Sequence, residues 1–138
     1  MILADTGYWV ALLSRTDAHH QRAVEVSATL KERLVTTWPV LTECTHLLST
    51  RAGGLVARRF LERCFAGAVQ LAELRVEERP RILELMARYA SLPMDLADAS
   101  LVVLAERLGD GRILSTDQRD FESYRWKNRK PFRNLLLS

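Results

Sequence analysis

Four acidic residues from distant segments stand where predicted strands end or predicted helices begin: Asp5, Glu43, Asp98 and Asp117. The first and the last follow short runs at 2–4 and 113–115, each suited to a buried strand. The other two fall in or near the first turn of predicted helices. In a parallel sheet all strands end at one edge, and the crevice beyond that edge is where ligands bind. We therefore expect these four carboxylates to converge.

Close carboxylates repel one another unless they are protonated or neutralised. A divalent cation that prefers oxygen ligands, Mg²⁺ or Mn²⁺, is the natural neutraliser, and it is bound by a few carboxylates together with water and phosphate. Such a site activates a water molecule and stabilises the leaving oxygen of a phosphodiester. The acids therefore predict metal-dependent phosphodiester hydrolysis.

Each acid also has a purely structural interpretation. Asp5 suits the cap of the helix that follows it, and Glu43 suits a solvated helix surface. Asp95 and Asp98 have the spacing of a capping pair, in which the first acid caps the helix and the second favours the helix dipole. Only the coincidence of four such positions favours a shared site.

The elements that must position these acids alternate along the chain. Apolar spacing predicts helices over 6–14, 21–33, 39–48, 55–65, 77–90, 95–108 and 117–121, and strands over 2–4, 34–37, 69–71, 111–115 and 135–137. Strands that alternate with helices through short links indicate an α/β fold with a mostly parallel sheet. The sequence predicts a single domain over residues 1–138, with four to five strands flanked by helices.

Composition indicates the class of protein and its expected location in the cell. The net charge is +3, and the apolar and charged fractions are ordinary for a globular protein. No apolar run approaches the ~18 residues of a membrane span, and no signal peptide is recognisable, so we expect a cytoplasmic protein without membrane contact. Cys44 and Cys64 lack metal-site spacing and are expected to be reduced thiols in the core.

A basic stretch near the C-terminus is interleaved with aromatic residues. Arg125, Lys127, Arg129 and Lys130 alternate with Tyr124, Trp126 and Phe132. Cations suit phosphates and aromatic rings suit stacked bases, so the four cations are candidate RNA-binding residues. The alternative is a solvated tail.

The segments 1–9, 38–43, 96–109 and 113–121 together resemble the PIN-domain nucleases, specifically the bacterial VapC-type toxins of type II toxin–antitoxin systems. The resemblance implies a PIN-like three-layer fold and a Mg²⁺- or Mn²⁺-dependent endoribonuclease acting on RNA such as tRNA or rRNA. It also implies a homodimer and a cognate VapB-type antitoxin that covers the site.

Carried over by position, the resemblance assigns catalysis to Asp5, Glu43, Asp98 and Asp117, with the metal held by Asp5, Asp98 and Asp117. It matches Thr6 and Thr116 to the hydroxyl residues that the family usually has beside the first and last acids. Asp95 and Asp120 are additional acids near the pattern, and we expect all four residues to support the ligands.

Two alternative functions remain at the level of the sequence: a PIN-like module that binds RNA without cutting it, and a structure-specific nuclease that is not a toxin. The triplet Asp5-Thr6-Gly7 also occurs in aspartic proteases, but here it leads into a predicted helix instead of a β-rich loop. A phosphatase of the haloacid dehalogenase type needs a second Asp at position 7, which is Gly.

Overall fold

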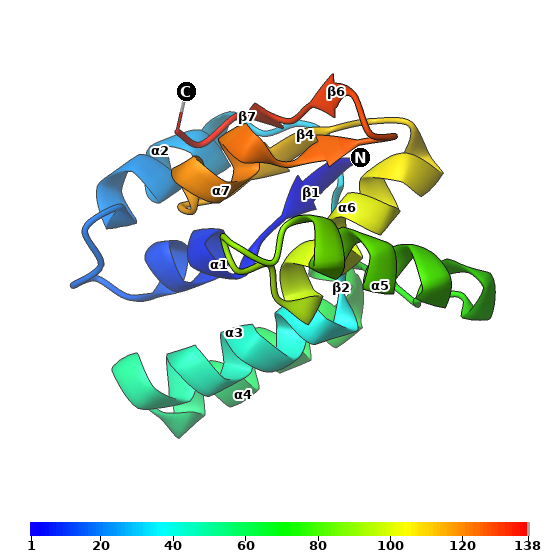
Figure 1. Ribbon diagram of the computed structural model, residues 1–138. Helices are drawn as coiled ribbons and strands as arrows, with labels where there is room; N and C mark the ends of the chain where they lie inside the picture. Colours follow the sequence, from blue (N-terminus) through cyan, green and yellow to red (C-terminus); the bar gives the residue numbers. More distant parts are fainter. Residues whose placement is uncertain (138) are drawn as a thin grey trace.

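The computed structural model describes residues 1–137 and has three layers (Figure 1). The central sheet holds β1 (Ile2–Ala4), β2 (Leu34–Thr37), β3 (Gln70–Ala72), β4 (Arg112–Leu114) and β7 (Arg133–Asn134), in the order β3-β2-β1-β4-β7. Every pairing in this sheet is parallel. All five strands therefore end at the same edge, and the predicted α/β fold with a parallel sheet is confirmed.

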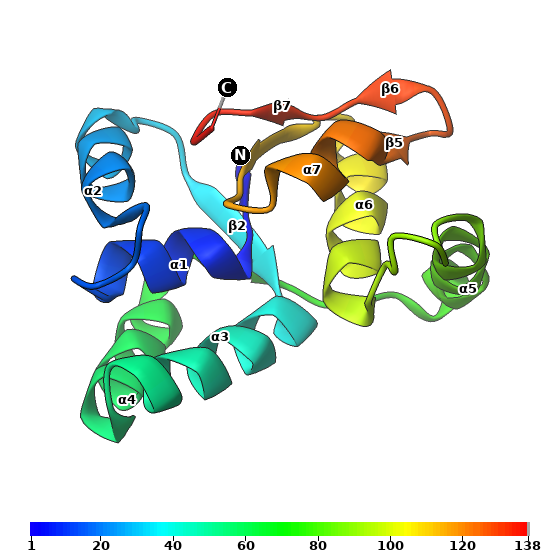
Figure 2. The same ribbon diagram turned by 60° about the vertical axis from the view of Figure 1, so that its left-hand side comes forward.

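Helices cover both faces of the sheet (Figure 2). One face carries α1 (Thr6–Leu13), α2 (His20–Thr29), α3 (Trp38–Arg51) and α4 (Gly54–Arg63), and the other carries α5 (Arg79–Arg88) and α6 (Leu96–Leu108). The remaining helical segments are α7 (Gln118–Ser123), a π-helical turn η1 (Cys64–Ala68) and a 3-10 turn η2 (Val76–Glu78).

Alternation along the strands divides the core into two clusters. Ile2 and Ala4 pack with α1 to α4, whereas Leu3 between them packs with α5 and α6. Helix α6 is buried along nearly its whole length, because its apolar residues lie on all sides instead of on one stripe. It ends at Gly109, whose left-handed conformation (φ 67°) suits glycine.

The structure differs from the predicted elements at two of their ends and in one hairpin, beyond shifts of a few residues at other ends. The strand predicted at 135–137 lies two residues earlier, as β7, although Leu135 still donates its backbone N–H to Ile113. The helix predicted over 21–33 ends at Thr29, because the chain must extend before β2. A short antiparallel hairpin of β5 (Arg125–Trp126) and β6 (Lys130–Pro131) was not predicted.

The predicted domain reaches residue 138, which lies outside the described residues. Cys44 and Cys64 are both buried and free, as expected. Among residues 1–137 the helices are too short or too polar to cross a bilayer.

Candidate active site

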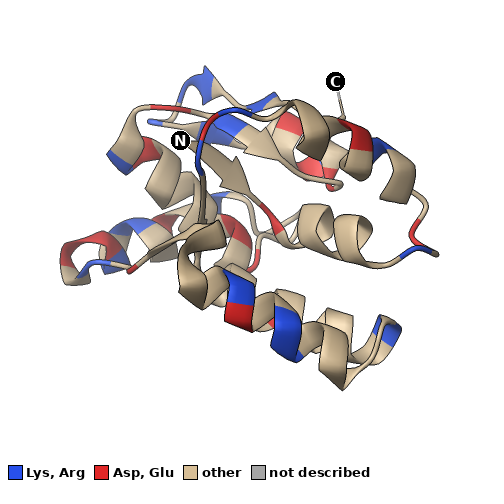
Figure 3. Ribbon diagram, turned by 180° about the vertical axis from the view of Figure 1, so that it is seen from behind, with Lys and Arg blue, Asp and Glu red and all other residues tan. Residues whose placement is uncertain are grey.

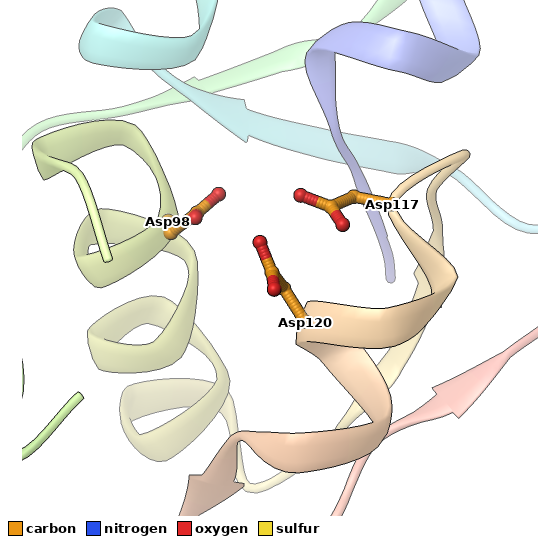
Figure 4. Close-up of side chains that lie close together, drawn as sticks. All are labelled: Asp98, Asp117 and Asp120. Carbon is orange, nitrogen blue, oxygen red and sulfur yellow. The ribbon is translucent and has the colours of Figure 1, made fainter. Parts of the chain in front are cut away.

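Three aspartates converge at the carboxyl edge of the sheet (Figure 4). One ligand oxygen from each of Asp98, Asp117 and Asp120 lies within 4.8 Å of the others. Asp98 comes from the first turn of α6, and the other two come from the start of α7 and the residue before it. All three side chains point toward a common centre. The sequence placed Asp98 and Asp117 at such a centre but gave Asp120 only a supporting role.

Asp5 lies beside this group without being one of the three. Its side chain caps α1, because its Oδ1 accepts the N–H of Thr6 at 2.8 Å. Its Oδ2 accepts a hydrogen bond of 2.7 Å from the buried hydroxyl of Ser115. The same hydroxyl accepts the backbone N–H of Asp117 at 3.0 Å. Ser115 thus joins the ends of β1 and β4, and it holds two of the predicted catalytic acids in one arrangement.

Ser115 contacts two of the acids, although the sequence pointed to its neighbour Thr116. Thr116 is half-buried and packs against Gly7 instead of bonding an acid. A Cβ built on Gly7 would lie 1.8 Å from the Thr116 Oγ1 and 3.0 Å from its Cβ. The glycine after Asp5-Thr6 therefore lets α1 approach the loop that carries Asp117. The sequence held a signal for Ser115, because it is the last residue of the strand predicted over 111–115 and directly follows β4.

Glu43 lies on α3 and is half-buried at the border of the acidic group. Its charge acts on Asp5, but its carboxylate is outside the trio of aspartates. The supporting role of Asp95 is local: its Oδ1 caps α6 by accepting the N–H of Asp98 at 2.8 Å. The predicted capping role of Asp95 is therefore confirmed, and the rest of its side chain is exposed.

Burial and mutual repulsion raise the pKa of these carboxyl groups. Burial raises the pKa of Asp98 to about 8, with a further increase from the charge of Asp5. Burial likewise raises the pKa of Asp5 to about 6, although the hydrogen bonds from Ser115 and Thr6 oppose the increase. The pKa of Asp117 is raised by burial and by its neighbour Asp120. Without a cation, the protein environment therefore does not fully stabilise the ionised forms of these carboxyl groups.

Two side chains partly offset this charge. The buried hydroxyl of Tyr124 donates to the Oδ2 of Asp98 at 2.8 Å. Arg119 forms an ion pair of 2.9 Å with Asp120, while its own side chain remains 74% exposed. An exposed cation beside a buried acidic group is available to a phosphate that enters the site.

A divalent cation fits this donor set. The three convergent ligands are carboxylate oxygens, which Mg²⁺ and Mn²⁺ prefer. The raised pKa values of Asp98 and Asp5 also show that positive charge at this edge would be stabilising. Asp98, Asp117 and Asp120 are placed to share one ion, with Asp5 adjacent.

The basic stretch lies at the opposite edge of the sheet. The backbone N–H of Lys127 donates to Glu106 near the end of α6, eight residues and about 12 Å along the helix from Asp98. Lys and Arg colour this β6 end of the molecule in Figure 3. The structure does not bring the predicted RNA-binding cations to the acids.

Two of the three aromatic residues of that stretch are buried and offer no surface for stacking. Tyr124 is fully buried and Trp126 is 7% exposed, and Phe132 packs against the same core. Lys127 and Lys130 lie over the Trp126 ring, and Arg125 donates to the carbonyls of Glu122 and Tyr124. The interpretation of Tyr124 and Trp126 as base-stacking groups is wrong, because both rings are buried in the core, whereas Phe132 is partly buried. Whether Arg125, Lys127, Arg129 and Lys130 contact RNA remains a prediction.

Comparisons with known proteins agree with this geometry. The chain is 27% identical over 124 residues to the ribonuclease VapC26 of Mycobacterium tuberculosis, covering 90% of this chain and 92% of that protein. Its fold matches the crystal structure of VapC20 from the same organism, described as a sarcin–ricin loop cleaving toxin, with a TM-score of 0.78 and 22% identity over 85% of this chain and 90% of the other. The model of the PIN domain family matches residues 2–127. The fold, the parallel edge that gathers the acids and this match together show that the chain belongs to the PIN domain family.

Proposed function

We propose that this protein is a metal-dependent endoribonuclease, the toxin of a type II toxin–antitoxin pair, which hydrolyses phosphodiester bonds in RNA such as tRNA or rRNA. The observation that carries the proposal is the convergence of Asp98, Asp117 and Asp120 beside Asp5 at the carboxyl edge of a PIN fold. The similarity to a protein named as a VapC ribonuclease supports the choice of RNA as substrate.

The proposed cofactor is Mg²⁺ or Mn²⁺. Asp98 and Asp117 are its proposed ligands, as predicted, with Asp5 as the third predicted ligand and Asp120 added on the strength of its position. When bound, the ion supplies a water of lowered pKa and charge stabilisation at the scissile phosphate. Ser115 and Tyr124 keep Asp5 and Asp98 in fixed orientations, so the acids need little rearrangement on binding.

Other side chains of this chain have proposed roles around the cut. For Glu43, whose charge acts on Asp5, the proposed role is to accept a hydrogen bond from the attacking water. Arg119 is free to exchange its ion pair with Asp120 for one with the phosphate. The hairpin cations Arg125, Lys127, Arg129 and Lys130 would contact RNA only if the substrate extends around α6 to the opposite edge.

We further propose that residues 1–138 form a single domain, because both core clusters pack on one sheet. Its proposed partners are a second copy of the chain and a VapB-type antitoxin that covers the acidic edge. The proposed location is the cytoplasm, where free thiols such as Cys44 and Cys64 stay reduced. Light scattering of the purified chain, alone and with the product of the neighbouring reading frame, tests both partners.

Cleavage of total bacterial RNA tests the activity. The purified chain, freed of any bound partner, is incubated with Mg²⁺ or Mn²⁺, with EDTA in a parallel reaction. Asp5→Asn is the inactive variant, expected to keep the fold and lose most cleavage. Asp17→Asn is the matched control, because Asp17 lies outside the acidic group and an amide oxygen still accepts the N–H of His19.

Discrete metal-dependent bands that vanish with EDTA and with Asp5→Asn, but persist with Asp17→Asn, are the expected result. Retained RNA binding without cleavage under either metal would instead identify a non-catalytic RNA-binding PIN module. Cutting of DNA as well as RNA would point to a structure-specific nuclease. A correctly folded Asp5→Asn that still cuts would refute the assigned site.

A further inference from the structure

An open groove of about 650 Å³ runs between the starts of α3 and α6, directly beside the acidic group. Its walls include Trp38, Glu43 and His46 from α3, and Asp95 and Leu96 from the start of α6. Glu43 also borders the acids, since its charge acts on Asp5. Any polymer whose phosphate reaches the aspartates therefore has this groove as a neighbouring surface.

Trp38 presents a fixed aromatic face in this groove. The side chain is 39% exposed, whereas Trp9 and Trp126 are each 7% exposed. Its indole Nε1 donates to Glu73 at 2.9 Å, and its ring rests against Phe65 with centroids 5.9 Å apart. Because Glu73 and Phe65 already restrict the ring, it loses little conformational freedom when a flat group stacks on it.

The two carboxylates in the groove disfavour a phosphate and favour a base. Among the described residues that line it there is no Lys or Arg, while Glu43 and Asp95 carry carboxylates. Carboxylates repel a phosphate but accept hydrogen bonds from the exocyclic amino groups of bases. Most of the remaining surface is apolar, with Leu96 47% exposed, which suits the face of an unstacked ring.

From these observations we propose that the groove is a subsite for one unpaired nucleobase of the RNA substrate, which stacks on Trp38 while the adjoining phosphate lies at the aspartates. The proposal rests on the proposed ribonuclease function and adds a substrate class to it: RNA that is single-stranded or splayed at the nucleotide next to the cut. Stacking on an aromatic residue contributes about 5- to 150-fold in affinity per base.

Binding of 2′-O-methyl hexanucleotides, which resist hydrolysis, tests the subsite without requiring cleavage. Separate hexamers of A, U and C, and an abasic hexamer with the same phosphates, are titrated into the protein with Mg²⁺. Trp38 is the exposed one of the chain's three tryptophans, so stacking quenches its fluorescence. We expect at least one base-containing hexamer to quench and to bind at least fivefold more tightly than the abasic hexamer.

Variants then assign the effect to Trp38. Trp38→Ala is expected to remove this preference for bases and to raise the KM for a cleaved RNA at least fivefold with kcat little changed. Trp38→Phe keeps a stacking face and should restore much of the affinity. Leu55→Ala is the matched control, because Leu55 is 53% exposed and lies outside the groove.

The failure of this proposal is distinguishable from failure of the proposed function. If wild type cleaves RNA but binds abasic and base-containing hexamers equally, or if Trp38→Ala cleaves with unchanged KM, the subsite is refuted and the groove is left to a protein partner. If wild type neither cleaves RNA nor binds any hexamer, the proposed function and the subsite fail together.

Discussion

The hydroxyl of Tyr124 donates a hydrogen bond of 2.8 Å to the Oδ2 of Asp98, and both side chains are buried. Tyr124 is held in turn by edge-on contacts with Tyr89 and Phe121, with ring centroids 5.0 and 5.1 Å away. A residue at the end of α7 thus orients an acid in the first turn of α6. This contact stabilises the charged form of a carboxyl group whose pKa burial raises to about 8.

Replacing Tyr124 by Phe should weaken catalysis most at low pH. Without the donated hydrogen bond the pKa of Asp98 rises further, so protons compete better with the metal at the acids. The acidic limb of the pH–kcat/KM profile is expected to move upward by about one pH unit, since a hydrogen bond to a charged group contributes about 1.5–3 kcal/mol. Tyr89→Phe is the control: it perturbs the same ring cluster without touching Asp98, and its limb should stay in place. An unshifted limb in Tyr124→Phe would refute this role.

Neutralising Asp98 should stabilise the metal-free protein. Its pKa is about 8 in the folded state and 3.8 without burial, so the folded state binds more protons between these values. The contribution of Asp98 to stability is therefore greatest at low pH and is lost as the pH rises from about 4 through 8. Asp98→Asn removes this loss and should raise the free energy of unfolding at pH 8 in EDTA by at least about 1 kcal/mol, because one pKa unit corresponds to about 1.4 kcal/mol.

Denaturant unfolding of wild type and Asp98→Asn at pH 5 and pH 8 measures this effect. Mg²⁺ should stabilise wild type at pH 8 and have less effect on the variant. Asp110→Asn is the comparison variant and should lower the free energy of unfolding at pH 8. Arg112 lowers the pKa of Asp110, so neutralising Asp110 removes a favourable ion pair. An Asp98→Asn protein that is less stable than wild type at pH 8 in EDTA would contradict the burial argument.

Replacing Gly7 by Ala should impair cleavage through the loop that carries Asp117. The added Cβ would stand 1.8 Å from the Thr116 Oγ1, so α1 and the loop must separate. Steady-state cleavage is expected to fall at least tenfold, since small displacements of catalytic groups cost about 100-fold in rate. Combining Gly7→Ala with Thr116→Gly removes the clash and should recover part of the activity. Equal activity of the single and double variants would show that the contact does not position the acid.

Replacing Ser115 by Ala should weaken both metal binding and cleavage. The group donates to Asp5 and accepts from the backbone N–H of Asp117, so its loss frees both acids. We expect weaker Mn²⁺ binding in a calorimetric titration and cleavage reduced by about 10- to 100-fold, within the range known for residues that orient metal ligands. Ser115→Thr keeps the hydroxyl, so this variant should retain more of the Mn²⁺ affinity and more of the cleavage activity than Ser115→Ala. Ser123→Ala, at an exposed hydroxyl on α7, serves as the control.

Local sequence patterns predicted most of the elements, because apolar spacing follows the period of a helix or a strand. Asp5 after β1 and Asp117 after β4 could be assigned to one edge because parallel strands end together. Boundaries in the last 15 residues were less predictable. The short strands there pair through the backbone, and their side chains show no clear alternation.

The sequence by itself determined that Asp98 and Asp117 meet at one edge, since their order along strands and helices leaves little choice in a parallel sheet. The tertiary structure added Asp120 to this group and left the carboxylate of Glu43 outside it. Only the tertiary structure decided which side chains act on those acids. Ser115 and Tyr124 reach Asp5 and Asp98 from 110 and 26 residues away, and such contacts leave no local pattern. The tertiary structure also decided which aromatic side chains are buried. The aromatic rings of the C-terminal stretch complete the core, whereas Trp38 remains exposed beside the acids because Glu73 and Phe65 hold it there.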